Sequence, residues 1–210
     1  MEQAMGIANT DSEPMNQATV SKEVAEFMDE DAIVTFDGGQ TMEWSGTFVQ
    51  IRHPRQKLFT PGMGHLGFGQ PFANAAKLCY PERQVINIAG DGGFGCTLQE
   101  LETAVRYNLP VINVISNDKA WGMIKGGQCA LYNNPCGVDL SDANYAEIAK
   151  GFGAYGERIE DPSQIKPAFE RAVQSGKPAV LDVLVQTTAH LMDQYWVTLV
   201  LNQCEMPMPA

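Results

Sequence analysis

The sequence predicts an α/β fold, a doubly wound and mostly parallel sheet with helices on both faces. Short apolar runs, such as Val85–Ala89 and Val111–Ser116, are typical of strands that are buried on both sides. Segments with helical periodicity separate these runs, as the crossovers between parallel strands require. With 210 residues, of which 44% are hydrophobic, the chain can bury one sizeable core.

The elements follow in a regular order after a polar leader, residues 1–16. We expect helix 18–29, strand 32–36, helix 41–51, helix 66–79, strand 84–89, helix 97–107, strand 111–116, helix 143–151, strand 153–158, helix 162–175 and strand 179–185. Two helix starts carry capping signals. Thr97 and Glu100 have the spacing of a capping box, and Asp161-Pro162 offers an N-cap followed by proline at the first helical position.

Charge and cysteine content exclude several classes of protein. The formal net charge of −11 argues against binding to nucleic acid or to an anionic membrane. The N-terminus has no basic region followed by an apolar stretch, and no apolar run approaches the ~20 residues of a membrane span. The cysteines are odd in number and lack CxxC spacing, which favours a reduced, cytoplasmic setting over a disulfide framework or a zinc site. They are Cys79, Cys96, Cys129, Cys136 and Cys204.

Two polar pairs follow predicted strands. Gly90-Asp91-Gly92 comes directly after the run that ends at Ala89, and Asn117-Asp118 comes after the next run. Carboxylate oxygens are what a hard cation such as Mg²⁺ needs. Two adjacent strand ends would then share one ion, although each aspartate alone is also compatible with an ordinary turn.

Two glycine-rich segments are compatible with binding phosphate. Gly92 and Gly93 lie between a strand and a predicted helix, where free backbone N–H groups can face an anion. Residues 62–67, GMGHLG, match the dinucleotide pattern GxGxxG. The strand before that pattern is short and no proper βαβ unit follows it, so an NAD-dependent dehydrogenase is the weaker alternative.

A longer series of blocks carries a family resemblance. AIVTFDGGQ, TPGMGHLGFGQPFANAAKL, PERQVINIAGDGGFGCTLQELETAVRYNLPVINVISND and WGMI occur in order between Asp31 and about Val185. This series resembles the diphosphate-binding (PP) domain of thiamin-diphosphate (ThDP) enzymes of the acetolactate synthase group, which includes oxalyl-CoA decarboxylase, 2-hydroxyacyl-CoA lyase and benzoylformate decarboxylase. It implies a PP domain over residues 17–186, followed by a tail, residues 187–210.

The resemblance implies a cofactor site. The side chains of Asp91 and Asp118 and the backbone carbonyl of Ala120 would bind Mg²⁺ together with diphosphate oxygens. The implied cofactor-binding residues are Gly38, Gly39, Gln40, Gly64, Leu66, Gly90, Asp91, Gly92, Gly93, Asp118, Ala120, Trp121, Gly122 and Met123. The family usually has asparagine where this chain has Asp118. Either the metal is held more tightly, or a nearby donor such as Lys119 compensates for the extra charge.

The resemblance also assigns catalytic positions. The backbone carbonyl of Gly64 would accept a hydrogen bond from the 4′-amino group of the cofactor, and Leu66 would be the apolar wedge that bends it. Bending brings the 4′ nitrogen near the C2 proton that it must remove, a gain in effective concentration. His65 lies between them and is a further catalytic candidate at a position that varies in the family.

Two departures from the family concern substrate and partner. Where acetolactate synthase carries a tryptophan after the WGMI-like block, this chain has Gly127, which favours a bulkier substrate such as an acyl-CoA over a small 2-oxo acid. The glutamate that activates the cofactor belongs to a pyrimidine-binding (PYR) domain, which nothing before Asp31 encodes. The resemblance therefore implies a separate PYR-bearing chain, in a heterotetramer with two copies of each.

The sequence thus predicts a lyase or transferase subunit that cleaves or forms a C–C bond next to a carbonyl. An acetolactate synthase-like large-subunit fragment and a non-catalytic scaffold subunit with a vestigial site remain as alternatives. The tail, residues 187–210, is apolar for a free end. It is expected to pack on its own domain, to close over the cofactor as a lid, or to dock on a partner.

Overall fold

The computed structural model describes residues 1–10, 12–60, 62 and 64–190. In this part of the chain, seven strands form one sheet with parallel pairing throughout. The strands are β1 (Met15–Asn16), β2 (Ile33–Asp37), β3 (Lys57–Leu58), β4 (Val85–Gly90), β5 (Ile112–Asn117), β6 (Tyr155–Ile159) and β7 (Ala179–Gln186). Their order is β3-β2-β4-β5-β7, and both β6 and β1 pair with β7. The predicted parallel α/β fold is confirmed.

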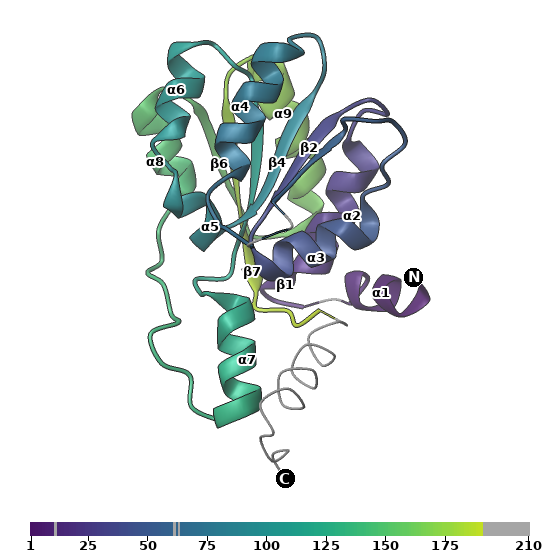
Figure 1. The fold of residues 1–210 in the computed structure, drawn as a ribbon, viewed down its shortest axis with the longest axis vertical. Helices are drawn as coiled ribbons and strands as arrows, with labels where there is room; N and C mark the ends of the chain where they lie inside the picture. Colours follow the sequence, from purple (N-terminus) through teal and green to yellow (C-terminus); the bar gives the residue numbers. More distant parts are fainter. Residues whose placement is uncertain (11, 61, 63, 191–210) are drawn as a thin grey trace.

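Helices cover both faces of the sheet. They are α1 (Glu2–Ala8), α2 (Gln17–Phe27), α3 (Gly39–Phe48), α4 (Gly69–Cys79), α5 (Asp91–Cys96), α6 (Glu100–Arg106), α7 (Gly122–Tyr132), α8 (Tyr145–Phe152) and α9 (Ile165–Ser175), with a 3₁₀ turn, η1, at Pro162–Gln164. In Figure 1, α2, α3 and α9 lie on one side of the strands and α4, α6 and α8 on the other. Side chains of strand β4 pack on both faces of the sheet. Ile86 and Ile88 belong to the hydrophobic core on one face, whereas Val85 and Ala89 belong to two clusters on the opposite face.

Buried polar side chains join the central strands. Thr35 Oγ1 donates to Asn87 Oδ1 at 2.8 Å, and Asn87 Nδ2 donates to Asn113 Oδ1 at 2.9 Å. These contacts join β2, β4 and β5 in a single register, since a slipped strand would leave these buried groups unpaired. The carboxyl ends of the three strands therefore meet at one edge.

The sheet reverses its winding between β2 and β4. The chain leaves β2 toward β3 and leaves β4 toward β5, in opposite directions. The carboxyl ends of β2 and β4 remain side by side, with Asp37 opposite Ala89. Such a switch point is where ligands bind in open α/β sheets.

The structure differs from the sequence prediction at the N-terminus. Within the predicted polar leader, residues 2–8 form α1, and β1 adds to the edge of the sheet. Ala4 and Ala8, one helical turn apart, are buried against Trp44 and Phe48. Because only two alanine side chains make this contact, the sequence of the leader has no marked hydrophobic periodicity from which a helix could be predicted.

The predicted helix 97–107 is present as the shorter helix α6, and an unpredicted helix, α5, precedes it. Asp91 opens α5, which ends at Cys96, and α6 begins at Glu100. The predicted capping box is wrong, because Thr97 Oγ1 donates to the carbonyl of Gly67 at 2.8 Å instead of capping α6. The cap at Asp161 is confirmed, since its carboxylate accepts from Ser163 N at 2.8 Å.

Helix α7 was not predicted and has no buried residue. Figure 1 shows it extending away from the sheet, below the carboxyl ends of the strands. A helix without a buried apolar face lacks the periodicity from which helices are predicted. Among the helices of the described residues, none is long and apolar enough to cross a bilayer.

Candidate active site

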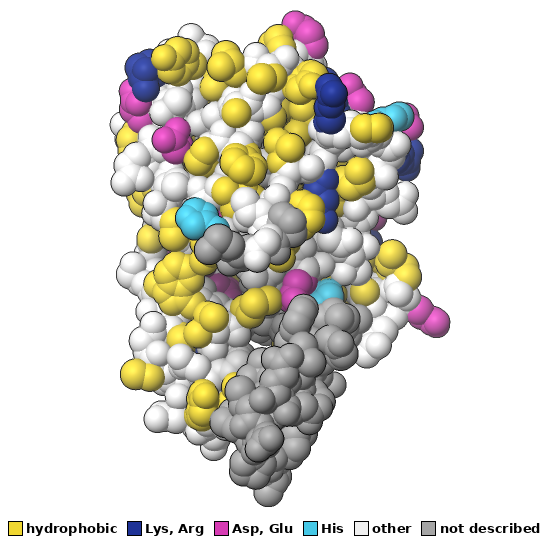
Figure 2. Space-filling model, viewed as in Figure 1, with side chains coloured by type: hydrophobic (Ala, Val, Ile, Leu, Met, Phe, Trp, Pro, Cys, Tyr) yellow, Lys and Arg dark blue, Asp and Glu magenta, His cyan; other side chains and the backbone are white. Residues whose placement is uncertain are grey.

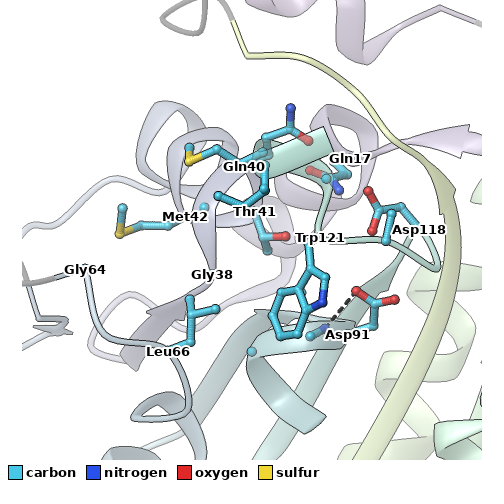
Figure 3. Close-up of a pocket in the computed structure, with 18 of the residues that line it drawn as sticks. Gln17, Gly38, Gln40, Thr41, Met42, Gly64, Leu66, Asp91, Asp118 and Trp121 are labelled. Atoms are coloured by element: carbon cyan, nitrogen blue, oxygen red, sulfur yellow. Dashed lines mark hydrogen bonds between the residues drawn. The ribbon is translucent and has the colours of Figure 1, made fainter. Parts of the chain in front are cut away.

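A pocket of about 250 Å³ lies at the carboxyl ends of β2, β4 and β5. Every site residue that the sequence predicted lines it: Gly38, Gly39, Gln40, Gly64, His65, Leu66, Gly90, Asp91, Gly92, Gly93, Asp118, Ala120, Trp121, Gly122 and Met123. The lining residues that sequence reasoning missed are Gln17, Thr41, Met42, Thr60, Phe68 and Ile124. In Figure 3, Gly64 and Leu66 lie on one side of the pocket, and Asp91 and Asp118 on the other.

Asp91 lies directly after β4 and is only 2% exposed. Its Oδ1 accepts from the backbone N–H of Gly92 at 2.8 Å, and its own carbonyl accepts from Tyr145 Oη at 3.2 Å. Burial, and then the charge of Asp118, raise the pKa of the Asp91 carboxyl to about 7. Burial also raises the pKa of Asp118.

In the described part of the chain, neither Asp91 nor Asp118 has an ion-pair partner. A buried carboxylate beside a half-buried one is unfavourable without a cation, and a divalent metal is what would compensate for them. The donor set fits Mg²⁺, which prefers oxygen ligands and usually takes one or two carboxylates together with phosphate oxygens.

Hydrogen bonds of the Asn117 side chain fix the turn after β5. Asn117 Nδ2 donates to the buried Asp182 Oδ1 at 2.9 Å, and Asn117 Oδ1 accepts from Lys119 N at 3.3 Å. Lys119 has a φ of 56°, a left-handed conformation that turns the chain sharply beside Asp118. The two residues of the predicted Asn117-Asp118 pair therefore have different tasks, because the first shapes the turn and the second faces the pocket.

The prediction that Lys119 compensates for Asp118 is wrong. Lys119 Nζ lies 3.0 Å from Asp142, with which it forms an ion pair. The hydrogen-bond donor to Asp118 is the hydroxyl of Thr187, at 2.9 Å from Oδ2. Thr187 follows β7 and is distant in sequence, so no local pattern pointed to it.

Close backbone approaches shape the floor of the pocket. Gly38 has a φ of 102°, and a Cβ there would lie 3.3 Å from the backbone nitrogen of Gly90. A Cβ on Gly92 would lie 2.4 Å from the ring of Trp121. Helices α3 and α5 begin at these glycine-rich turns, where the first backbone N–H groups have no partner within the helix. Such helix starts favour an anion.

The loop that carries Gly64 and Leu66 is held by two other segments. The Asp37 carboxylate accepts from Gly67 N, at 3.2 Å and 3.1 Å for its two oxygens, and Thr97 holds the Gly67 carbonyl. The predicted helix 66–79 accordingly begins only at Gly69. This arrangement does not support the dinucleotide interpretation, since no long strand precedes the loop and no helix starts at its third glycine.

Gln17 enters the pocket from the first residue of α2. It is 3% exposed, and its Oε1 has no hydrogen-bond partner among the described residues. Figure 3 shows it near Asp118. Nothing in the local sequence signals a pocket residue here, because Gln17 reaches the site through the pairing of β1 with β7.

The fold and the pocket together define a class of protein, a parallel α/β domain with a pocket at its switch point that two carboxyl groups and glycine-rich helix starts line. Residues 37–183 match the family described as "Thiamine pyrophosphate enzyme, C-terminal TPP binding domain", and the chain belongs to this family. Its cofactor is thiamin diphosphate, and Mg²⁺ is the usual metal of the family.

Similar proteins span several activities. The chain is 37% identical over 172 residues to a "Probable acetolactate synthase" of Mycobacterium bovis, covering 81% of this chain and 31% of that protein. It is 35% identical over 182 residues to "2-hydroxyacyl-CoA lyase 2" of Danio rerio, covering 83% and 29%. A thiamine diphosphate-dependent 4-hydroxybenzoylformate decarboxylase of Rhodococcus jostii superimposes with a TM-score of 0.79 at 26% identity, covering 84% and 34%. The chain thus spans about a third of each.

Proposed function

We propose that this chain forms the PP half of the active site in an enzyme that cleaves or forms a C–C bond next to a carbonyl. The domain would comprise residues 17–186. Thiamin diphosphate, when bound, supplies the nucleophilic carbon and the electron sink for such chemistry. The chain's own contribution is to bind the metal and the diphosphate, to bend the cofactor and to exclude water.

One observation carries this proposal. Two carboxyl groups without an ion-pair partner in the described residues, the buried Asp91 and the half-buried Asp118, share a pocket with the glycine-rich starts of two helices. The carboxylates and the carbonyl of Ala120 would hold Mg²⁺, and the glycine-rich segments 38–40 and 90–93 would lie against the diphosphate.

The opposite wall would hold the other end of the cofactor. Leu66 lies in the pocket across from the aspartates, as an apolar wedge requires. Gly64 has a φ of 59°. This turn suits a residue whose carbonyl accepts from the 4′-amino group. His65 is exposed at the rim, where it would transfer a proton to or from a bound substrate.

The substrate side favours a large ligand. A Cβ on Gly127 would have no heavy atom within 4 Å, so this helix position leaves open space. A 2-hydroxyacyl-CoA or a bulky 2-oxo acid fits such a wall. Acetolactate synthesis is the second candidate, because the mycobacterial relative carries that name.

A partner chain would complete the site. We infer that it carries the PYR domain and its glutamate, in a heterotetramer with two copies of each chain. Exposed apolar residues support an interface: Phe72 and Leu78 on α4, and Tyr107 after α6. Figure 2 shows apolar side chains over this upper part of the molecule, with few Lys and Arg side chains among them.

The decisive experiment is Mg²⁺-dependent ThDP binding, followed by substrate assays. Calorimetry on the full chain should show ThDP binding with Mg²⁺ and none with EDTA. The chain purified with its natural partner should then be assayed with 2-oxo acids and with 2-hydroxyacyl-CoAs. A cofactor-loaded complex that turns over neither class would favour a scaffold function instead.

A further inference from the structure

Asp118 carries a charge that the usual asparagine would not. The structure places one of its two oxygens, Oδ2, against the protein. Oδ2 accepts from Thr187 Oγ1 at 2.9 Å, and a Cβ on Gly122 would lie only 2.5 Å from it. Oδ2 is thus enclosed by the first residue of α7 and by the threonine. The other oxygen, Oδ1, accepts no side-chain hydrogen bond from the described residues.

Thr187 is the first residue of a short segment, the strap (residues 187–190), that follows β7. The strap is anchored to helices α2 and α3. Thr188 Oγ1 accepts from the backbone N–H of Gln17 at 3.3 Å, and Trp44 Nε1 donates to the Thr188 carbonyl at 3.0 Å.

The far end of the strap is fixed as well. The His190 ring packs edge-on against Trp44, with centroids 4.6 Å apart, and its Nε2 lies 3.1 Å from Thr47 Oγ1. Trp44 is fully buried, so it offers a rigid base. The hydroxyl of Thr187 is therefore held in place by contacts that do not involve Asp118.

A hydroxyl is well suited to this position. It donates one hydrogen bond to the carboxylate but brings no charge, whereas a lysine would compete with a metal ion for the same oxygen. Lys119 is paired with Asp142, so it does not play that part. The carboxylate keeps its full negative charge while one oxygen is fixed.

We propose that Thr187 is a positioning residue for the metal site, which holds Oδ2 of Asp118 against the protein so that Oδ1 is presented to the cation. This inference rests on the proposed function of the pocket. With a metal bound, the hydroxyl would leave Asp118 one oxygen, Oδ1, for the cation. The sequence offers no hint of this role, because Thr187 lies outside the region that matches the family, residues 37–183.

The test uses the full chain with Mn²⁺ as the probe metal and ThDP, and counts free Mn²⁺ by electron paramagnetic resonance. Thr187→Val, which keeps the shape but removes the donor, should weaken Mn²⁺ binding by about tenfold. Thr187→Ser keeps the hydroxyl and should stay within about threefold of the wild type. Thr10→Val, the matched control, removes an exposed hydroxyl that donates to the Gly6 carbonyl and leaves the strap unchanged, so it should also stay within that range. Circular dichroism and thermal melting check that each variant folds.

A second comparison isolates the pair. In an Asp118→Asn background, the effect of Thr187→Val should shrink to less than about threefold, since an amide has no charge to present. Equal losses in both backgrounds, or a loss in Thr10→Val as large as in Thr187→Val, would overturn the inference and leave the proposed function intact. Failure of the wild-type chain to bind Mn²⁺ with ThDP would instead overturn the proposed function, and this inference with it.

Discussion

The carboxylate of Asp37 accepts a hydrogen bond from the backbone N–H of Gly69 at 2.8 Å, at the start of α4. The same carboxylate accepts from Gly67, so the end of β2 fixes the position of the loop that carries Leu66. Asp37 is 1% exposed, and burial raises its pKa. A buried acid that has no lysine or arginine beside it among the described residues is retained here for its contacts with the backbone.

Replacement of Asp37 should therefore destabilise the fold and loosen the Leu66 loop. Asp37→Ala leaves two buried N–H groups without an acceptor and should lower the free energy of unfolding by about 2–4 kcal/mol. Urea denaturation measures this. Asp161→Ala is the control, because it removes a carboxylate with similar backbone contacts at an exposed cap and should cost about 1 kcal/mol or less. Equal losses in the two variants would contradict the role given to Asp37.

The pKa of Asp91 predicts how the metal-free protein responds to pH. Its folded-state value of about 7 lies above the ordinary value of an aspartate, so the unfolded chain ionises first as pH rises. Stability should fall between about pH 4 and pH 7, by roughly 4 kcal/mol from this group, and then level off. Urea titrations at several pH values, in EDTA, measure the slope. Asp91→Asn should flatten part of it, and an unchanged slope would show that Asp91 titrates normally.

The metal ligands can be separated by substitution. Asp91→Ala should abolish Mg²⁺-dependent ThDP binding, because it removes a buried carboxylate from the site. Asp118→Asn should preserve it, since it restores the residue usual in the family. Calorimetry on the assembled enzyme distinguishes the two variants. Unchanged ThDP affinity in Asp91→Ala would contradict the assignment of Asp91 as a metal ligand.

The parts of the site that the sequence predicted are those with a local signal. Asp91 and Asp118 follow apolar strands, and the glycines sit at turns, so neighbouring residues reveal them. Gln17 and Thr187 are different, because the pairing of Met15 with Val185 between β1 and β7 brings them to the pocket. Contacts between residues so far apart in the sequence do not affect the local hydrophobic periodicity from which elements are predicted.

The prediction of secondary structure failed where tertiary contacts outweigh the local helix propensity of the sequence. The glycine-rich segment 91–96 has poor helix propensity and was expected to be a loop. It forms α5 because Phe94 is buried against Tyr145, with ring centroids 5.7 Å apart. The predictions for the tail beyond His190 concern residues 191–210, which lie outside the described residues.

Gly127 offers a test of substrate size. The space around its position accommodates a larger side chain, so Gly127→Trp should fold normally. We expect slower turnover of a bulky native substrate, by about tenfold, with ThDP affinity unchanged, because the position lies beyond the residues that line the cofactor pocket. Kinetics and calorimetry together check this. A parallel loss of ThDP binding would mean that α7 faces the cofactor rather than the substrate.

The need for a partner chain gives the last prediction. The metal and diphosphate residues that we propose lie within this chain, and we propose that a PYR domain on a partner chain supplies the glutamate that activates the cofactor. The chain alone should therefore bind Mg²⁺ and ThDP. It should exchange the C2 proton of the cofactor orders of magnitude more slowly than a complete enzyme, where each tenfold in rate corresponds to ~1.4 kcal/mol of activation free energy. Exchange into deuterated solvent, followed by NMR, measures the rate. Asp91→Ala serves as the control for exchange in free solution, since it should not bind the cofactor. Addition of the natural partner should accelerate the exchange, whereas enzyme-like exchange without it would place the activating group within this chain and exclude the split active site.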